Sequence, residues 1–567
     1  MPVFPRIYVS SPDGGWLKFA RPRRILAAYR ADEVADIVAA VSAAVSAGQY
    51  AAGFVGYEAA AAFDSAHRTK EPSPSRPLIW FALADSPPSA AELPSRAAHF
   101  CGPWRAALRR AEYCAAVRDI QDRIAAGDVY QVNFTYPLRA RFAGCPLSLF
   151  GEMCARQPSP WRFFAETEEW AVCSASPECF FERRGGALLS RPMKGTRPAG
   201  RGAAARLAAS EKDRAENLMI VDMMRNDMSK LPDARRVRGE SLLQIREYPT
   251  VVQMTSTVVC DTAAGLDGVF AALFPCASVT GAPKIAAMSM IAALEKSPRG
   301  VYCGACGWAG GGVARFNVAI RTAFADKRTG VAEYGSGSGV VADSSAAAEW
   351  RECRAKAAIL IPSAPPHLVE TMRAEGGKVA LLPRHLSRLA ESAKRFGIYF
   401  RKNRAAQMIR EKCASIQKSA VLRLLLSADG KLFLQTRDIP PPQNEARAML
   451  SPRRTDSRCE LLRHKTDRRA IYEDAMILAR KGGFADAVLQ NERGEITETC
   501  IANIAAKIGG EWRTPPVSCG LLPGVMRGAM IVGGELTEAV LRAEDLRRAE
   551  KICRLNAVRG MEEITVE

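Results

Sequence analysis

The feature that most restricts the fold of this chain is a proline-rich segment at 361–367, Ile-Pro-Ser-Ala-Pro-Pro-His. Proline fixes φ and lacks a backbone donor, so three prolines in five residues end the helix expected before them and form a short, stiff connection. We therefore predict two domains, at 1–360 and 368–567, joined by this linker. A chain of 567 residues is long enough for at least two hydrophobic cores.

Composition and charge argue against several classes of protein. The sequence has no run of eighteen apolar residues and does not start like a signal peptide, so we expect a cytoplasmic protein without a membrane partner. Sixteen scattered cysteines are interpreted as buried thiols rather than disulfides. The formal net charge is +19, but basic and acidic residues are interleaved, which favours small anionic ligands over nucleic acid.

One informative group of charged residues lies at 174–231. Glu178 ends one predicted strand, and after a glycine turn at 185–186 a second strand delivers Lys194 into a loop. The apolar residues that follow recur at helical spacing, and Glu216 lies within that helix. Taken alone, Lys194 is interpreted as a solvated loop lysine and Glu216 as a charge on a helix surface.

A second group of charges lies on a helix predicted at 345–360. Glu349, Glu352 and Lys356 are spaced so that they share one face of this helix. One interpretation is a solvated helix on which Glu352 and Lys356 form an ion pair. The other is that the carboxylates converge with Glu216 on an oxygen-rich Mg²⁺ site, completed by water and a substrate carboxylate.

Three segments of the N-terminal domain match one family pattern. Ser-Pro-Glu occurs at 176–178, Pro-x-Lys-Gly-Thr at 192–196, and Lys-Asp-Arg-x-Glu with a later Val-Asp-x-x-Arg-Asn-Asp at 212–227. The domain therefore resembles the chorismate-utilising enzymes, which are the anthranilate, aminodeoxychorismate, isochorismate and salicylate synthases. The resemblance implies an α+β fold, with a β-sandwich-like domain and surrounding helices.

The resemblance also implies catalytic roles. Aminodeoxychorismate synthases carry lysine where this chain has Lys194, whereas anthranilate synthases usually carry alanine, so Lys194 is implied as the nucleophile that attacks C2 of chorismate before ammonia adds at C4. Glu178 is implied as the general acid for loss of the substrate hydroxyl, provided that burial raises its pKa. Gln253 stands where anthranilate synthases commonly have a histidine associated with pyruvate elimination, which fits a site that stops at aminodeoxychorismate.

The matching positions further imply a metal and substrate contacts. Because Glu-x-x-Glu-x-x-x-Lys at 349–356 matches the family motif, the Mg²⁺ interpretation of Glu216, Glu349 and Glu352 is preferred. Arg321 and Lys356 are then implied partners of substrate carboxylates.

Backbone amides and glycines supply the other implied contacts with the substrate. Thr280 and Gly281 precede a helix that starts near Pro283, where free amides suit an anion, although an ordinary helix cap explains Thr280 almost as well. Gly337, in a glycine-rich strand, is a further candidate contact.

Four ordered signatures follow the proline-rich segment, at 382–397, 461–472, 486–504 and 514–527. Together they resemble the fold-type IV pyridoxal phosphate enzymes, the group of branched-chain aminotransferases and aminodeoxychorismate lyases. An α/β domain that binds pyridoxal 5′-phosphate is implied over nearly the whole of residues 368–567.

That resemblance assigns roles to five residues. Lys465 is implied to form the Schiff base, Glu498 to pair with the pyridinium nitrogen, and Arg388 to hold the phosphate together with the backbone amides of Gly524 and Val525. Met526 and Ala502 stand where many relatives have hydroxyl residues, so the affinity for the phosphate is expected to be weaker. The resemblance therefore supports the fold more strongly than it supports lyase activity.

The two halves together imply a bifunctional enzyme. The first would convert chorismate to 4-amino-4-deoxychorismate, and the second would release pyruvate to leave 4-aminobenzoate, a folate precursor. No glutaminase domain is recognisable, so ammonia would come from solution or from a separate glutamine amidotransferase subunit. A homodimer through the C-terminal domain is left open. The alternatives are an anthranilate synthase large chain with an aminotransferase tail, a first half fused to an inactive lyase half, and a scaffold protein with decayed sites.

Overall fold

The computed structural model describes residues 4–93, 99–247, 251–360, 362–439, 441 and 446–567. The chain divides into two compact units, each of which is considered by itself. The second unit contains the region after the proline-rich segment together with two short segments from the first part of the chain. The first unit comprises Met1–Ser95, Trp104–Ala140 and Leu149–Ile361, and the second Arg96–Pro103, Arg141–Ser148 and Pro362–Glu567.

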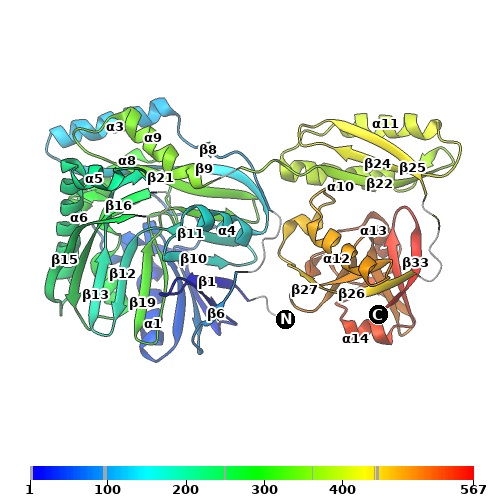
Figure 1. The fold of residues 1–567 in the computed structure, drawn as a ribbon, viewed down its shortest axis with the longest axis horizontal. Coiled ribbons are helices and arrows are strands. Elements are labelled where there is room, and N and C mark those ends of the chain that lie inside the picture. The colour runs from blue at the N-terminus through cyan, green and yellow to red at the C-terminus, as the bar shows by residue number, and fades with distance from the viewer. Residues whose placement is uncertain (1–3, 94–98, 248–250, 361, 440, 442–445) are drawn as a thin grey trace. The chain divides into compact units, whose positions relative to one another are not determined.

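One large sheet of the first unit has the strand order β17-β9-β21-β20-β11-β10-β1-β2-β6. In this order β9 pairs with the glycine-rich strand β21, which contains Gly337 (Figure 1). The strands are β1 (Arg6–Ser10), β2 (Trp16–Phe19), β6 (Ser89–Ala91), β8 (Arg105–Ala106), β9 (Gln131–Gly144), β10 (Trp161–Glu166), β11 (Trp170–Ser176), β17 (Gly281–Ala282), β20 (Thr322–Asp326) and β21 (Val331–Val340), while β7 (His99–Cys101) pairs with the end of β9 inside the second unit.

The other large sheet has the order β14-β16-β13-β12-β19-β18-β4-β5-β3, with β15 also paired to β16. The two sheets pack face to face, because Phe163 and Val172 from the first share one core with Phe54 and Trp80 from the second. This confirms the predicted sandwich-like domain. The strands are β3 (Arg24–Ala28), β4 (Tyr50–Val55), β5 (Ile79–Ala84), β12 (Cys179–Arg184), β13 (Ala187–Arg191), β14 (Met193–Pro198), β15 (Arg235–Glu247), β16 (Val251–Asp261), β18 (Ala305–Gly310) and β19 (Val313–Val318).

Helices cover the outer faces of both sheets. Val38 of α1, Met224 of α6 and Phe270 of α7 pack with Phe181 and Phe316 of the second sheet. Side chains of α3, α8 and α9 form another cluster with β9. Each helix therefore presents an apolar stripe to a sheet. The helices are α1 (Val34–Ser46), α2 (Ala60–Phe63), α3 (Arg110–Ala125), α4 (Pro146–Arg156), α5 (Ala203–Ala208), α6 (Glu211–Ser229), α7 (Leu266–Leu273), α8 (Lys284–Leu294) and α9 (Ala346–Lys356), with short 3₁₀ turns at Ala31–Glu33, Tyr57–Ala59, Ala277–Val279 and Ala357–Ile359.

Three local predictions for the first unit were wrong. Lys194 lies in strand β14 rather than in a loop, although the register of β14 against β16 shifts next to it. The segment 72–94 is rich in Pro, Ser and Ala, which predicts a surface loop or an irregular connection, but it contains the fully buried strand β5. The helix expected from residue 206 is two helices, because Ser210 caps a new helix, α6, by accepting a hydrogen bond from the Asp213 amide at 3.4 Å. The β-rich pattern at 248–256 predicts a strand, whose first three residues lie outside the described residues.

The second unit contains a four-stranded sheet, β23-β22-β24-β25, and an eight-stranded sheet, β28-β27-β26-β33-β32-β29-β30-β31. The latter encloses a core that includes Val488, Ile504 and Ile564. Helix α10 (Leu382–Phe396) ends at Gly397, which has a left-handed φ of 69°.

The elements of this unit are β22 (Leu368–Glu375), β23 (Lys378–Val379), α10 (Leu382–Phe396), α11 (Lys402–Ala414), β24 (Ala420–Leu426), β25 (Leu432–Asp438), β26 (Ala446–Thr455), α12 (Ala470–Lys481), β27 (Asp486–Asn491), β28 (Ile496–Thr499), β29 (Asn503–Ile508), β30 (Glu511–Thr514), α13 (Val525–Val532), β31 (Thr537–Glu538), α14 (Ala543–Arg548), β32 (Lys551–Asn556) and β33 (Gly560–Val566), with 3₁₀ turns at Glu460–Arg463 and Val517–Cys519.

The structure bears on two compositional expectations. The sixteen cysteines are thiols rather than disulfides, and all except Cys114 are buried, as predicted. Across the described ranges, no helix combines the length and apolar character that a membrane span requires.

Candidate active sites

Glu178 lies in the connection between β11 and β12 of the first unit, and its backbone is fixed on both sides. Its N–H donates to Ser176 Oγ at 3.1 Å, and its carbonyl accepts from the Val318 amide at 3.1 Å. The carboxyl group is buried, and within the described residues its Oε1 has no hydrogen-bond partner. Burial raises the pKa of Glu178 to about 7, against the opposing influence of the Ser278 hydroxyl and the Lys194 charge.

Lys194 extends from β14, and its backbone is tied to helix α6. The Asn217 amide donates to the Lys194 carbonyl at 3.5 Å and to the Met254 carbonyl at 3.2 Å, while Asn217 Oδ1 accepts from Ser256 Oγ at 2.5 Å. Within the described residues the Lys194 ammonium forms no hydrogen bond or ion pair, so its position is set by the backbone.

Three predicted carboxylates surround the Lys194 amine closely enough to feel its charge. Lys194 lowers the pKa values of Glu178, Glu216 and Glu352 relative to what their environments would otherwise give. Burial nevertheless raises the pKa of Glu216, and the neighbouring Glu352 carboxylate adds to this increase. The structure thus brings the predicted nucleophile, acid and two metal ligands into one electrostatic cluster.

Glu352 takes the ion-pair arrangement that the sequence also allowed. Its Oε1 lies 2.7 Å from Lys356 Nζ, which donates in addition to the Gly337 carbonyl at 2.9 Å. Burial acts to raise the pKa of Glu352, but Lys356 and Lys194 outweigh it and the pKa falls below its usual value. Lys356 therefore connects helix α9 to strand β21 while facing the cluster.

The three predicted metal ligands are not gathered equally. Glu216 and Glu352 influence each other's charge, whereas Glu349 is buried and its Oε1 accepts from Ser344 Oγ at 2.8 Å. Across the described part of the chain, no three His, Cys, Asp or Glu side chains are arranged to hold a metal ion. Mg²⁺ is commonly bound by one or two carboxylates with water and substrate oxygens, so Glu216 and Glu352 fit such an ion by themselves.

Arg321 lies in the turn between β19 and β20 with a positive φ of 52°. Its Nη1 donates to the Lys356 carbonyl, which also accepts from the Tyr334 hydroxyl at 2.8 Å. This contact places Arg321 at the end of α9, where Lys356 is the last residue.

The remaining predicted contacts have local structural roles. The Thr280 hydroxyl is buried and donates to the Ala277 carbonyl at 3.1 Å, so it does not cap α8, whose N-cap is Pro283. Gly281 has a φ of 150°, and a Cβ there would collide with the Gln131 carbonyl across the β9–β17 pair. A Cβ on Gly337 would lie 2.5 Å from the Phe134 carbonyl. Both glycines are required by close backbone packing.

Gln131 belongs to a Gly-Asp-x-x-Gln sequence at 127–131, which matches a family signature and is interpreted from the sequence as scaffold of the substrate domain. Its side chain is 1% exposed, and neither amide atom has a hydrogen-bond partner within the described residues. A Cβ placed on Gly339 would collide with the Gln131 amide and lie 3.3 Å from Lys194 Nζ, so both side chains converge on this glycine. A buried amide without partners is costly unless a ligand or water completes it. The Gly-Asp-x-x-Gln signature at 127–131 was the available signal.

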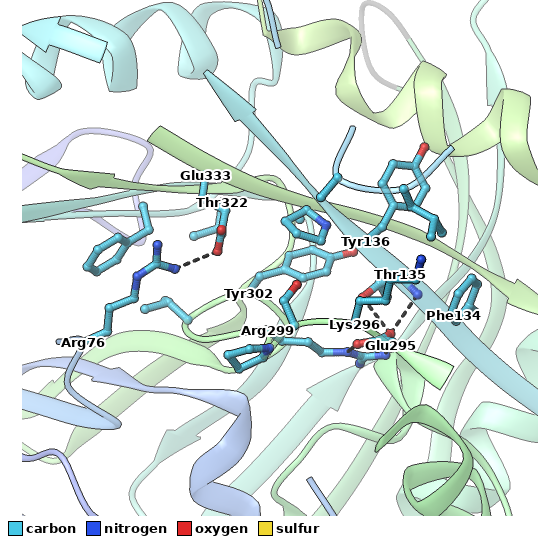
Figure 2. A pocket seen from close by; sticks show the side chains of 18 of the residues that line it. Arg76, Phe134, Thr135, Tyr136, Glu295, Lys296, Arg299, Tyr302, Thr322 and Glu333 are labelled. Atoms are coloured by element: carbon cyan, nitrogen blue, oxygen red, sulfur yellow. Dashed lines mark hydrogen bonds and ion pairs between the residues drawn. The ribbon is translucent and has the colours of Figure 1, made fainter. Parts of the chain in front are cut away.

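A pocket elsewhere in the first unit is lined by none of the predicted site residues (Figure 2). Four of its charged side chains form two ion pairs within the lining. Arg299 Nη2 lies 2.7 Å from Glu295 Oε1, and Arg76 Nη1 lies 2.7 Å from Glu333 Oε1. Tyr302 and several apolar side chains form the remaining walls. The residues of the Lys194 cluster therefore do not line this pocket.

Lys465 of the second unit follows a 3₁₀ turn, and its carbonyl accepts from the Val369 amide at 2.9 Å. Burial, together with the charges of Arg388 and Arg469, lowers the pKa of Lys465 to about 8, against the opposing charges of Glu370 and Glu498. An amine with this pKa is substantially neutral near pH 8, the form that reacts with a carbonyl group.

Glu498 lies in strand β28, and three donors fix its carboxylate. Its Oε1 accepts from the Tyr472 hydroxyl at 2.7 Å and from the Leu522 amide at 3.1 Å, and its Oε2 accepts from Asn503 Nδ2 at 3.1 Å. Burial raises the pKa of Glu498 to about 7, although the Tyr472 hydrogen bond and the charges of Arg469 and Lys465 oppose this.

Arg388 on helix α10 contacts the segment just before helix α13 through the Pro523 carbonyl. Arg388 forms a two-pronged ion pair with Glu370, at 2.9 and 2.7 Å, and Nη1 donates to the Pro523 carbonyl at 3.1 Å. Gly524 is the N-cap of α13 and provides no side-chain cap, so the first amides of that helix are available to an anion. A Cβ on Gly524 would collide with Asn503 Oδ1. The arrangement fits a phosphate group.

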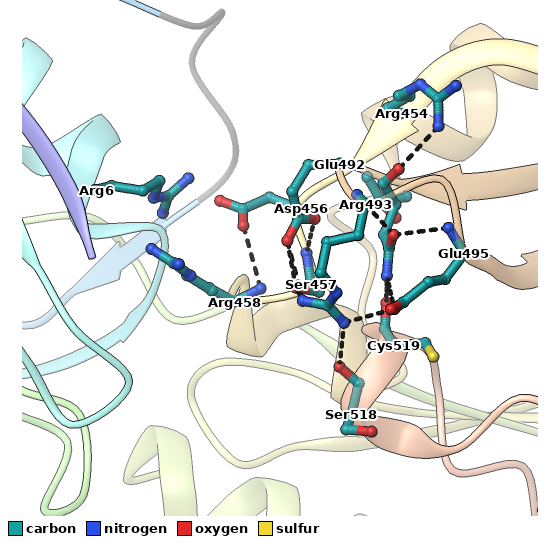
Figure 3. A network of polar contacts seen from close by, with 12 residues as sticks. Arg6, Arg454, Asp456, Ser457, Arg458, Glu492, Arg493, Glu495, Ser518 and Cys519 are labelled. Carbon is teal, nitrogen blue, oxygen red and sulfur yellow. Dashed lines mark hydrogen bonds and ion pairs between the residues drawn. The ribbon is translucent and has the colours of Figure 1, made fainter. Parts of the chain in front are cut away.

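A polar network joins the loops that lead to these residues (Figure 3). Arg493, in the turn between β27 and β28, donates to Ser457 Oγ at 2.6 Å, to Glu495 Oε2 at 2.6 Å and to the Ser518 carbonyl at 3.2 Å. The three loops continue to Lys465, to Glu498 and to the start of α13, so the network fixes their relative positions.

Comparison with known proteins agrees with both halves of this description. The family model for chorismate binding enzymes matches residues 4–362. The chain belongs to the chorismate-binding enzyme family. The model for class IV amino-transferases matches residues 367–566, so this member carries a fold-type IV domain, a domain that implies pyridoxal phosphate as cofactor.

Individual relatives cover the chorismate-binding part. Aminodeoxychorismate synthase component 1 of Klebsiella aerogenes is 36% identical over 288 residues, which are 49% of this chain and 62% of that protein. Anthranilate synthase component 1 of Streptomyces coelicolor is 38% identical over 280 residues, which are 47% of this chain and 53% of that protein. The chain thus spans little more than half of the length of these curated relatives.

A solved structure supports the fold. The crystal structure of anthranilate synthase component I from Streptococcus pneumoniae aligns with 63% of this chain and 92% of its own, with a TM-score of 0.50 and 21% identity. At that identity the likeness concerns the fold of this chorismate-binding enzyme, and the assignment of its activity depends on the side chains of the site.

Proposed function

We propose that the first unit aminates chorismate at C4 to give 4-amino-4-deoxychorismate, and that the second unit releases pyruvate from this product to give 4-aminobenzoate. The observation that carries the first step is the Lys194 amine, which lies among Glu178, Glu216 and Glu352 and beside the unpartnered amide of Gln131. Relatives with either synthase name match the chain at similar identity, so this lysine, rather than overall similarity, favours the aminodeoxychorismate product.

The geometry supports a two-stage displacement. Lys194 Nζ forms a bond to C2 of chorismate, the ring double bonds shift, and the C4–O bond breaks while Glu178 supplies the proton that makes water. Ammonia then bonds to C4, the double bonds shift back, and the bond between C2 and Lys194 breaks. The ammonium formed at C4 returns one proton to the Glu178 carboxylate, which leaves Lys194 as a neutral amine and Glu178 protonated. The net change exchanges hydroxyl for amine. A carboxyl with a pKa of about 7 is partly protonated at neutral pH, as the acid role requires.

Mg²⁺ and an ammonia source complete the proposal for the first unit. Glu216 and Glu352 would hold Mg²⁺, which supplies positive charge opposite a substrate carboxylate. Arg321 and Lys356, which meet at the end of α9, are proposed to bind the carboxylates directly. The relative's designation as component 1 is consistent with a separate glutamine amidotransferase subunit that delivers ammonia to this chain.

In the second unit, Lys465 would hold pyridoxal phosphate covalently, Glu498 would bind its ring nitrogen, and Arg388 with the amides of Gly524 and Val525 would bind its phosphate. The bound cofactor supplies an electron sink for cleavage at the amine-bearing carbon. Lys465 is proposed to take the proton from C4 and deliver it to the methylene carbon of the departing enolpyruvyl group, which releases pyruvate and leaves an aromatic ring.

Product analysis tests both steps. The purified chain is incubated with chorismate, ammonium, Mg²⁺ and pyridoxal phosphate, and 4-aminobenzoate, aminodeoxychorismate and anthranilate are separated. We expect 4-aminobenzoate without any added lyase. Accumulated aminodeoxychorismate would contradict the role of the second unit, and anthranilate would contradict the inference from Lys194 and Gln253.

A further inference from the structure

A further positive side chain lies in the Lys465 site, and the function proposed above gives it no role. Arg469 is the N-cap residue of α12, four positions after Lys465. Its guanidinium lies over the Tyr472 ring, 4.6 Å from the ring centre, and Nη2 donates to the Cys500 carbonyl. One ring face and one backbone carbonyl therefore hold this guanidinium in place.

The support for Arg469 connects it to the cofactor-binding residues. The same Tyr472 whose ring carries the guanidinium donates its hydroxyl to Glu498 at 2.7 Å. The charge of Arg469 acts on Lys465 and on Glu498, since it lowers the pKa of each. Arg469 thus lies near both the predicted cofactor lysine and the predicted partner of the ring nitrogen.

Most N–H groups of the Arg469 guanidinium have no acceptor among the described residues. Of its five N–H groups, one donates to Cys500, and within the described residues no carboxylate forms an ion pair with it. Arg388 in the same site differs, because Glu370 pairs with its charge and three of its five N–H groups already donate to Glu370 and to the Pro523 carbonyl. A half-buried cation with no acidic partner is unfavourable unless a ligand supplies the anion.

We propose that Arg469 binds a carboxylate of the ligand that reacts at Lys465. This inference rests on the proposed function of the second unit, whose substrate and products all carry carboxylates. The planar fork of arginine matches a carboxylate through two parallel hydrogen bonds. Arg388 and the start of α13 are available for the cofactor phosphate, which leaves Arg469 for an anionic group that the cofactor does not supply.

The test compares an acid with its neutral analogue. The full chain loaded with pyridoxal phosphate is titrated with 4-aminobenzoate and with 4-aminobenzamide, and the dissociation constants are read from the change in cofactor absorbance. In Arg469→Gln we expect the dissociation constant of the acid to rise about tenfold or more, as for loss of a charge-assisted hydrogen bond, and that of the amide to stay within twofold. Arg469→Lys is expected to restore part of the preference for the acid.

A matched control removes the same charge outside the site. Arg463 is exposed, and Arg463→Gln is expected to leave both dissociation constants within twofold of the wild-type values. The affinity for pyridoxal phosphate, measured on each apo-protein, is expected to change less than threefold in Arg469→Gln. A variant that keeps the acid preference, or one that loses cofactor affinity as strongly as acid affinity, overturns the inference.

The proposed function is tested by a different measurement, the formation of 4-aminobenzoate. If the wild-type chain forms no 4-aminobenzoate, yet loses its acid preference in Arg469→Gln, the lyase assignment is wrong and the carboxylate site stands. If 4-aminobenzoate forms and the preference does not depend on Arg469, the lyase assignment stands and the carboxylate site is wrong.

Discussion

Replacement of Glu178 by glutamine is expected to stabilise the first unit at alkaline pH while it removes the amination activity. Burial raises the pKa of Glu178 from its ordinary value of 4.5 to about 7. A tenfold change in proton affinity corresponds to about 1.4 kcal/mol, so keeping this carboxylate ionised in the folded state costs about 3 kcal/mol above pH 7. Glutamine has a similar shape and carries no charge, so it does not incur this cost.

The sign of the effect follows from the two protonation states. Below pH 4.5 the carboxyl is protonated in folded and unfolded chains, and Glu178→Gln changes stability little. Between pH 4.5 and 7 only the unfolded chain ionises, so the wild-type protein loses stability relative to the variant, and above pH 7 the difference is constant. The advantage of the variant should therefore grow from near zero at pH 4.5 to about 3 kcal/mol at pH 8.

Calorimetric unfolding at several pH values measures this difference, and chorismate turnover measures the loss of the acid. We expect turnover to fall about 10²- to 10⁴-fold, the usual contribution of general acid catalysis. Glu168→Gln, at an exposed turn, is the matched control and should show no pH-dependent gain. A gain in Glu178→Gln that is the same at pH 4.5 and pH 8, or a loss at both, would refute the reasoning about burial.

Three further substitutions test the proposed roles. Lys194→Ala should abolish aminodeoxychorismate formation or redirect it towards anthranilate, and an unchanged rate in product analysis would exclude the nucleophile role. Lys465→Ala should remove the absorbance band of covalently held pyridoxal phosphate while amination persists; loss of both reactions would show that the halves are not independent. Glu216→Gln should raise the Mg²⁺ concentration for half-maximal rate about tenfold or more, as for loss of a hydrogen bond to a charged group, whereas an equal effect of Glu349→Gln would contradict the two-carboxylate site.

Local patterns predicted the elements whose signals are contained in short stretches. The helix that contains Arg388 has an apolar stripe and is followed by Gly397, and both the stripe and the glycine are visible in the sequence. The turn at Gly185 and the strands on either side of it were predicted for the same reason. The sandwich-like fold of the first unit was implied by the family resemblance and is found in the packing of its two sheets.

Features that depend on distant residues were missed. Lys194 was assigned to a loop because its strand, β14, pairs with β16, and Gln253, opposite Thr196 in that pair, lies more than fifty positions later in the chain. The signature that contains Gln131 was recognised, but its importance comes from an unpartnered buried amide next to Gly339 on β21, and neither the burial nor the neighbour is visible in a sequence. The raised pKa of Glu178 likewise depends on burial by the fold.

The two sites use a similar carboxyl group for different purposes. Glu178 and Glu498 are both buried, and the pKa of each is raised to about 7. Glu498 accepts hydrogen bonds at both oxygens from Tyr472, Leu522 and Asn503, so its position is fixed and it suits a permanent partner such as a ring nitrogen. Within the described residues Glu178 Oε1 accepts none, which leaves that oxygen able to carry a proton to a substrate. The number of donors around each carboxyl, rather than its pKa, therefore distinguishes the group that holds a ligand from the group that transfers a proton.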